Sequence, residues 1–284
     1  MSRNAERLAS HNATTETTHN ATTETTPAST EQSLTFKVPT SFVELPSEGK
    51  FYSAEHALCN QNVVEIKNMT TREEEILNSQ SLIQRGLAVD RLVESILVDK
   101  SIEASSLLLG DKNAILTAAR IDAYGETYDV TITCPVCSEP NETVIDLSSL
   151  KRKNPESMEN IEINNKGNVV LELPRTGAVV ELRFLTTKDE GIINKFTKKN
   201  KKLGLEKMIT LQYKQMIVSV NGSESILDIS KFIGSMPAYD SRFLRKKYQE
   251  IVPDLDLGFN FACRLCGEEQ SLEVPITVGF FWPK

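Results

Sequence analysis

The sequence is organised around two short cysteine motifs, Cys134-Pro135-Val136-Cys137 and Cys263-Arg264-Leu265-Cys266. Each follows an alternating apolar run and precedes another, which is the pattern of a strand, a tight turn and a second strand. Two thiolates three positions apart can hold one tetrahedral ion from a single turn, and two such turns complete a four-sulfur site. We therefore predict one structural Zn²⁺ bound by Cys134, Cys137, Cys263 and Cys266. Closed sites of this kind do no chemistry at the metal.

The cysteine motifs leave other interpretations open. They can be unrelated reduced thiols, two surface disulfides, a redox-active pair, or turns that share a metal between subunits. The N-terminal stretch lacks an apolar signal core, so we expect the chain to stay in a reducing cytosol, where metal binding is favoured over disulfides. We expect the fifth cysteine, Cys59, to be a small buried or loop residue.

Length and composition restrict the classes of protein that fit. A chain of 284 residues predicts one large or two modest domains. The hydrophobic fraction of 39% is enough for a real core. A net charge of −7 argues against a chain built to coat nucleic acid. No apolar run approaches the roughly 20 residues that a membrane span requires, so no membrane partner is expected.

Residues 1–33 are polar and contain a perfect octapeptide duplication, residues 11–18 and 19–26. Such a segment cannot bury enough apolar surface to offset the entropy lost on ordering. We predict a disordered tail, with metal binding through His11 and His19 as the alternative.

Segments of the first half of the remaining chain return in the second half. Asp111 precedes Cys134 by 23 residues, and Asp240 precedes Cys263 by the same 23. Three other segments also recur. Glu44-Leu45-Pro46-Ser47-Glu48-Gly49 corresponds to Glu172-Leu173-Pro174-Arg175-Thr176-Gly177. Residues 63–67 correspond to residues 179–183, and residues 70–74 correspond to residues 186–190. This order predicts two degenerate internal copies.

The predicted fold is therefore α+β, with a copy at residues 34–150, a linker at 151–168 and a second copy at 169–284. Each copy has a strand, capped helices and a cysteine hairpin, and the two copies share a zinc-ribbon-like site. In the first copy, Thr70 and Glu73 have the spacing of a capping box at a helix start. Residues 218–222 predict a strand that runs into a tight hairpin turn.

Other candidates for chemistry are weaker. His56 and Cys59 have a spacing that a catalytic dyad can use, but ordinary loop neighbours explain it better. Lysines 195, 198, 199, 201 and 202 form a basic cluster, which is either a solvated helix face or a docking patch for an acidic partner or DNA. No catalytic residue is predicted, so we expect no enzyme. The candidates for partner contacts are Phe51, Tyr52, Phe280, Phe281 and Trp282, and burial in the chain's own core is the alternative for the three C-terminal ones.

An ordered set of motifs resembles the baseplate hub family of T-even-like contractile-tailed phages, from about residue 36 to the end. These motifs are Leu45-Pro46-Ser47 with Gly49 and Phe51-Tyr52, Thr71-Arg72-Glu73-Glu74-Glu75, Leu108-Leu109-Gly110-Asp111 with Asn113, Cys134-Pro135 with Cys137, Asp240-Ser241-Arg242 with Leu244-Arg245, and Phe280-Phe281-Trp282-Pro283. The resemblance implies a structural virion protein in or below the hub, with no catalytic residue. Two residues depart from the pattern. Ser138 stands where a turn of this kind often carries Gly, and Arg264 stands in the second turn where the first turn has Pro135.

The resulting hypothesis is a baseplate hub or hub-assembly subunit that acts by protein–protein interlocking. The implied partners are other hub, tail tube or tape-measure proteins, with a homo-oligomer also possible. The implied location is the virion tail baseplate, after assembly in the host cytoplasm. Three alternatives remain: a zinc-ribbon nucleic-acid-binding regulator, a thiol oxidoreductase, and an assembly factor that is absent from the mature virion.

Overall fold

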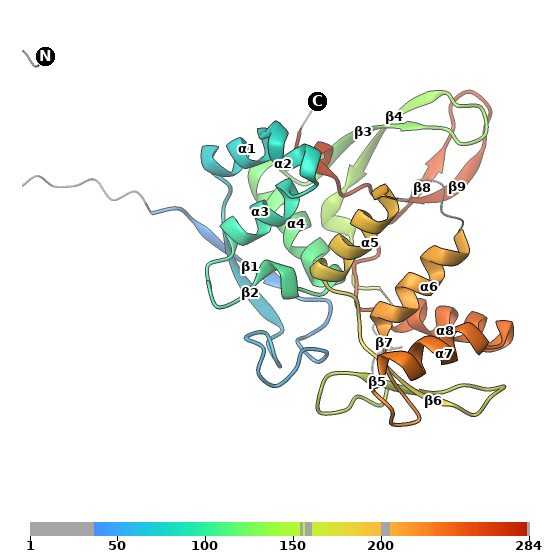
Figure 1. Cartoon of the computed structure of the whole chain (residues 1–284). Helices are drawn as coiled ribbons and strands as arrows, with labels where there is room; N and C mark the ends of the chain where they lie inside the picture. Colours follow the sequence, from blue (N-terminus) through green and yellow to red (C-terminus); the bar gives the residue numbers. More distant parts are fainter. Residues whose placement is uncertain (1–36, 154–155, 157–160, 200–204, 283–284) are drawn as a thin grey trace, which may run out of the picture. The chain divides into compact units, whose positions relative to one another are not determined.

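The computed structural model describes residues 37–153, 156, 161–199 and 205–282. The predicted tail with its octapeptide repeat lies outside the described residues. Val38–Lys284 forms one compact unit, to which everything below refers. Helices and small antiparallel sheets alternate along this unit, so the predicted α+β class is confirmed (Figure 1).

The first part of the unit is a two-stranded sheet followed by helices. In β1 the exposed Phe42 alternates with the buried Val43, as expected for a strand with one face on the core. Its elements are β1 (Thr40–Glu44), antiparallel β2 (Val63–Lys67), α1 (Thr71–Asn78), α2 (Gln80–Arg85), α3 (Ala88–Ile96), η1 (Ala104–Ser106) and α4 (Leu109–Tyr124).

Helix α1 begins with the predicted capping box. The Glu73 carboxylate accepts hydrogen bonds from the Thr70 backbone N–H at 2.9 Å and from the Thr70 hydroxyl at 2.6 Å. Lys67 adds an ion pair to the same buried carboxylate at 2.8 Å. The cap therefore joins the end of β2 to the start of α1, which a sequence pattern alone does not reveal.

The second part of the unit contains a three-stranded antiparallel sheet and four helices. β7 lies at the edge of the sheet, beside β6. The predicted strand and its tight hairpin turn are both present: Val220 and Ser223 pair across Asn221 and Gly222, whose φ angles are +49° and +78°, and the chain then continues into α7. The elements are β5 (Val169–Glu172), β6 (Val179–Leu182), α5 (Thr187–Lys199), α6 (Leu205–Met216), β7 (Ile217–Val220), α7 (Ile226–Ser235) and α8 (Ala238–Ile251).

Two buried aspartates occupy corresponding places near the starts of α4 and α8. The Asp111 carboxylate accepts from the backbone N–H of Ser47 at 3.0 Å and from its hydroxyl at 2.6 Å. The Asp240 carboxylate accepts from the backbone N–H and hydroxyl of Thr176, at 3.0 Å and 2.8 Å. Each aspartate therefore fixes a turn 64 residues earlier in the chain.

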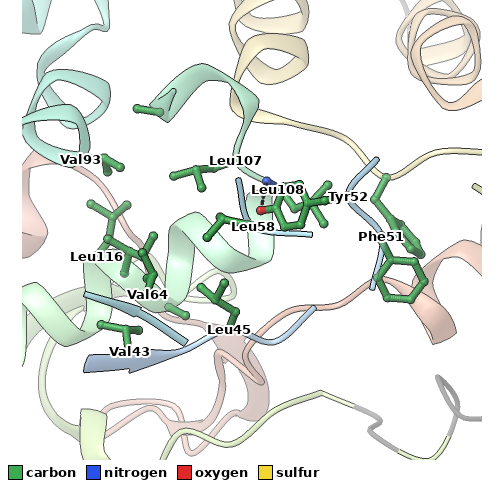
Figure 2. Close-up of a cluster of buried hydrophobic side chains, with 14 of the residues drawn as sticks. Val43, Leu45, Phe51, Tyr52, Leu58, Val64, Val93, Leu107, Leu108 and Leu116 are labelled. Atoms are coloured by element: carbon green, nitrogen blue, oxygen red, sulfur yellow. Dashed lines mark hydrogen bonds between the residues drawn. The ribbon is translucent and has the colours of Figure 1, made fainter. Parts of the chain in front are cut away.

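The main core lies between the β1–β2 sheet and the first set of helices, and it continues into the second part of the unit. Figure 2 shows the side chains that fill it near β1, including the hydrogen bond from the Leu108 N–H to the Tyr52 hydroxyl at 3.1 Å. The backbone of α4 at Gly110 packs closely against the backbone at Pro253. A Cβ added to Gly110 would lie 1.9 Å from the Pro253 carbonyl oxygen. Only glycine fits there.

Four of the five candidate aromatics lie in this core. Phe51 and Tyr52 are 6% exposed, Phe280 is 1% exposed and Phe281 is fully buried. All four side chains pack in the core of the unit, and the expectation that these aromatics contact a partner stays a prediction. Trp282 is half-buried against the same cluster.

Part of the predicted linker is hydrogen-bonded to the rest of the unit. The Lys153 N–H donates to the Asp254 carbonyl at 2.8 Å, and the Asp256 N–H donates to the Lys151 carbonyl at 2.7 Å. Residues 151–153 are therefore paired with the stretch that follows α8. Residues 154–155 and 157–160 of the predicted linker lie outside the described residues.

Candidate metal centre

Two β-hairpins carry the cysteine motifs. β3 (Thr127–Thr133) pairs with β4 (Pro140–Asp146), and β8 (Gly258–Ala262) pairs with β9 (Glu269–Glu273). The first hairpin follows α4 and the second follows α8. Figure 1 shows them side by side, away from the helices.

The two hairpin turns have the same backbone hydrogen bonds. The Cys134 N–H donates to the Glu139 carbonyl and the Cys263 N–H to the Glu268 carbonyl, each at 2.8 Å. The N–H four positions after each of these cysteines donates back to the cysteine carbonyl, from Ser138 at 2.8 Å and from Gly267 at 3.0 Å. We call these two turns the knuckles.

Ser138 and Gly267 also share a backbone conformation. Their φ angles are +60° and +71°, in the left-handed region that favours glycine. Gly267 adopts it without steric cost, whereas Ser138 adopts it at a position where the family pattern often has Gly. The departure noted in the sequence therefore leaves the shape of the first knuckle unchanged.

The four knuckle sulfurs converge from turns that are more than 120 residues apart in the chain. All four lie within 4.8 Å of one another. The Sγ atoms of Cys134 and Cys266 are 3.7 Å apart, and those of Cys137 and Cys263 are 3.6 Å apart. A tetrahedral ion with sulfur ligands at about 2.3 Å requires sulfur–sulfur separations of about 3.8 Å. A disulfide would need about 2.05 Å, so the geometry fits a metal and not crosslinks.

Hydrogen bonds favour the thiolate form of one ligand. The backbone N–H groups of Cys266 and Leu265 point at the Cys263 sulfur and lower its pKa to about 6. The pKa of Cys266 is raised, although the Glu268 backbone N–H lowers it, because burial and nearby sulfurs favour its protonated form. Such a set of coupled thiols releases protons when a divalent ion binds.

Asn141, on β4, is a site residue that the motif search missed. It is 3% exposed. Its Nδ2 donates to the Glu139 carbonyl at 2.9 Å and contacts the Cys263 sulfur at 3.5 Å, while its Oδ1 accepts from the Arg264 N–H at 2.8 Å. The signal available in the sequence was a polar residue seven positions after Cys134, matched by Gln270 seven positions after Cys263.

The hydrophobic support of the site is small and separate from the main core. Its buried members are Cys134, Phe261 and Cys263, with a few half-buried neighbours. An isolated two-stranded hairpin is at best marginally stable in water. The two hairpins therefore share little apolar surface of their own.

The other sequence candidates do not form a catalytic constellation. The His56 ring lies against the Ser106 hydroxyl at 2.7 Å and stacks on Tyr52 with ring centroids 4.3 Å apart. Burial lowers the pKa of His56. Cys59 is half-buried in the same loop, as expected of loop neighbours. Lys195 is exposed on α5, and the side chains of the other four cluster lysines lie outside the described residues.

The fold and the site together define a mixed α+β protein with a four-cysteine cluster of metal-binding geometry. The chain belongs to the family described as T4 bacteriophage base plate protein, which matches residues 19–282. The resemblance noted in the sequence is confirmed at this level, and the match begins within the predicted tail. Membership makes the chain a structural component of a phage tail baseplate, which contacts other baseplate and tail proteins.

No curated protein and no solved structure matches the chain. In the described part of the chain, no helix combines the length and apolar character needed to cross a membrane.

Proposed function

We propose that this chain is a subunit of the baseplate hub, or of its assembly, and that a structural Zn²⁺ rigidifies it for interlocking with neighbouring proteins. The observation that carries the proposal is the convergence of four sulfurs, two from each knuckle, in a member of a baseplate family. Hub, tail tube and tape-measure proteins are the proposed partners, and the virion tail is the proposed site of action.

Cys134, Cys137, Cys263 and Cys266 are the proposed ligands. Four thiolates around a tetrahedral position are typical of structural zinc, with no open site for substrate. The ion would close a loop of about 125 residues, which is otherwise entropically costly. Isolated zinc peptides gain ~10–16 kcal/mol from the metal, which is an upper scale here because the main core folds around other contacts.

We further propose that the chain arose from two copies of one unit. The paired turns held by Asp111 and Asp240 support this, as do the matching knuckles. The helix caps add to it, because Asp189 accepts from the Thr186 N–H at 2.9 Å as Glu73 does from Thr70. The proposed boundaries are residues 34–150 and 169–284.

Native mass spectrometry of the purified chain tests the metal proposal. We expect one zinc per chain, lost when any of the four knuckle cysteines is changed to serine. Cys59→Ser is the matched control and retains the ion. A chain with no metal at neutral pH, or with full metal after Cys263→Ser, contradicts the proposal. The mass of the zinc-loaded species also shows whether the ion is shared between subunits.

Mass spectrometry of purified virions tests the location. Peptides from this chain in intact tails support a resident hub subunit. Their absence from tails, together with their presence in infected-cell extracts, would instead support an assembly factor that leaves before completion. The nucleic-acid-binding alternative has little support, because the zinc-bearing hairpins are acidic and would repel a phosphate backbone.

A further inference from the structure

The tips of the two knuckles expose apolar side chains at the same position of each turn. Val136 is 63% exposed and Leu265 is 68% exposed, and each follows the first cysteine of its motif by two positions. Large aliphatic side chains at the end of a hairpin lose favourable burial unless something covers them. Because the four knuckle sulfurs lie within 4.8 Å of one another, both tips lie at the same end of the paired hairpins.

The two hairpins that carry these tips are strongly acidic. Residues 127–146 carry four carboxylates and no Lys or Arg, and residues 258–273 carry three carboxylates and one Arg, which together give −6. The whole chain has −7, so the other 248 residues contribute only −1. Nearly the entire charge excess is thus concentrated on the two hairpins.

The glutamates of the hairpins lack cationic partners within the chain. Among the described residues, no ion pair involves Glu139, Glu142, Glu268, Glu269 or Glu273. Elsewhere in the unit, carboxylates do find cations: Lys112, for example, bridges Asp90 at 2.8 Å and Glu190 at 2.9 Å. Arg264 is the one Lys or Arg on the two hairpins, so it offsets only part of this negative charge.

A hollow lies beside the second tip. It has a volume of about 550 Å³, and its lining includes Glu139, Glu142 and Leu265 together with the chain's own Arg264. Two carboxylates next to an exposed leucine match the chemistry of a lysine or arginine side chain, whose aliphatic stem packs on apolar surface while its charged end reaches the carboxylates.

We propose that the knuckle tips form a docking surface for a basic segment of a neighbouring baseplate protein, with Lys or Arg side chains flanking an apolar residue. The occupant is argued from charge complementarity: apolar tips alone would accept many partners, but tips flanked by Glu139, Glu142, Glu268 and Glu269, with Arg264 as the one hairpin cation, select a cationic one. This inference rests on the proposed baseplate function and specifies the chemistry of one contact. Docking covers Val136 and Leu265, and it neutralises the surrounding glutamates.

The test is zero-length carbodiimide crosslinking of purified baseplates, which joins carboxylates to lysine amines in direct contact, followed by peptide mass spectrometry. We expect crosslinks from Glu139, Glu142 or Glu269 to lysines of a different baseplate protein. Crosslinks from these glutamates only to lysines of a second copy of this chain overturn the proposed partner. A chain that is present in baseplates but crosslinked only elsewhere overturns the docking surface and leaves the baseplate function intact. Absence of the chain from baseplates overturns both.

Variants of the knuckle tips distinguish loss of the docking contact from loss of folding. In a phage whose own copy is disrupted, complementation with the double variant Val136→Ser/Leu265→Ser, or with Glu139→Gln/Glu142→Gln, is expected to lower incorporation into baseplates at least tenfold. The matched control is Ile226→Ser/Leu227→Ser, which alters side chains that are 81% and 71% exposed on α7, far along the chain from either knuckle. Zinc content and Tm of each purified variant should equal those of the parent. Normal incorporation of both knuckle variants would overturn the proposal.

Discussion

The Nδ2 atom of Asn141 lies 3.5 Å from the sulfur of Cys263, so a side chain of the first hairpin holds a ligand of the second knuckle. The same side chain accepts a hydrogen bond from Arg264 at 2.8 Å. Asn141 therefore orients the second knuckle in addition to linking the hairpins. Hydrogen bonds of this kind tune the ligands they touch.

Asn141→Ala is expected to weaken zinc affinity by about 10- to 100-fold, the range for lost partners of metal ligands. Competition against a chromogenic chelator measures this. Asn260→Ala is the control, because Asn260 is exposed on β8 of the second hairpin. Equal affinities of the two variants would show that Asn141 does not position the site.

Removal of the metal is expected to loosen the hairpins while the helices stay folded. The hairpins share only a small apolar cluster, whereas α4 lies in the main core. After chelation, amide hydrogen exchange should accelerate strongly in β3, β4, β8 and β9, and protection in α4 should persist. Uniform loss of protection would mean that the ion stabilises the whole unit, and an unchanged pattern would mean that it is not structural.

Arg120→Met is expected to reduce the free energy of unfolding by about 2–4 kcal/mol, since it removes three charged hydrogen bonds and leaves the buried Phe280 carbonyl without this donor. Arg120 is 1% exposed. It donates to the carbonyls of Phe280 at 3.0 Å, Gly125 at 3.2 Å and Thr127 at 3.2 Å, which joins α4 to the base of the first hairpin and to the C-terminal aromatics. Urea denaturation measures the change. Arg245→Met, at an exposed position of α8, should have little effect.

Gly110→Ala and Gly191→Ala are expected to have opposite effects, although both glycines are helical. A Cβ at Gly110 meets the Pro253 carbonyl oxygen at 1.9 Å, so backbone must shift, at a cost of about 1–3 kcal/mol or more. A Cβ at Gly191 meets nothing within 4 Å, and alanine there should stabilise α5 by up to about 1 kcal/mol. Thermal unfolding of the two variants provides the comparison. Equal shifts in Tm would refute the close approach of α4 to residue 253.

The capping box predicts a specific acid sensitivity. Burial raises the pKa of Glu73, but donors from Lys67, Ser95 and Thr70 outweigh it and lower the pKa from 4.5 to about 2. A carboxylate with a depressed folded-state pKa contributes stability that is present above about pH 4.5 and is lost as the pH falls towards about 2. Glu73→Gln should remove this part of the pH dependence, worth about 1.5–3 kcal/mol, and Glu75→Gln at an exposed position of α1 should preserve it. Parallel unfolding curves for parent and Glu73→Gln across pH 2–5 would contradict the assignment.

Local patterns in the sequence predicted local structure well. The cap at Thr70 and Glu73, the end of α4 before Gly125, and the two cysteine hairpins follow from residue spacing, because each depends on a few neighbouring side chains. The convergence of the four sulfurs was also predictable, since each knuckle alone offers two ligands of a set of four.

Contacts between distant segments were not predictable in the same way. Nothing in the spacing of residues indicates that Asn141 reaches Cys263 or that Gly110 packs on Pro253, because these contacts depend on how whole elements pack. The C-terminal aromatics looked equally suited to a partner or to the chain's own core. Their packing against Tyr128 and α4 could not be read from the sequence, because burial is a property of the folded chain.

Each cysteine hairpin is rooted at the end of its own long helix, β3 after α4 and β8 after α8. If the proposed ion joins their far ends, a mechanical pull on either tip would be shared by both helices, and separating the hairpins would first require breaking metal–sulfur bonds. A baseplate component would gain this load sharing without any increase in the size of its core.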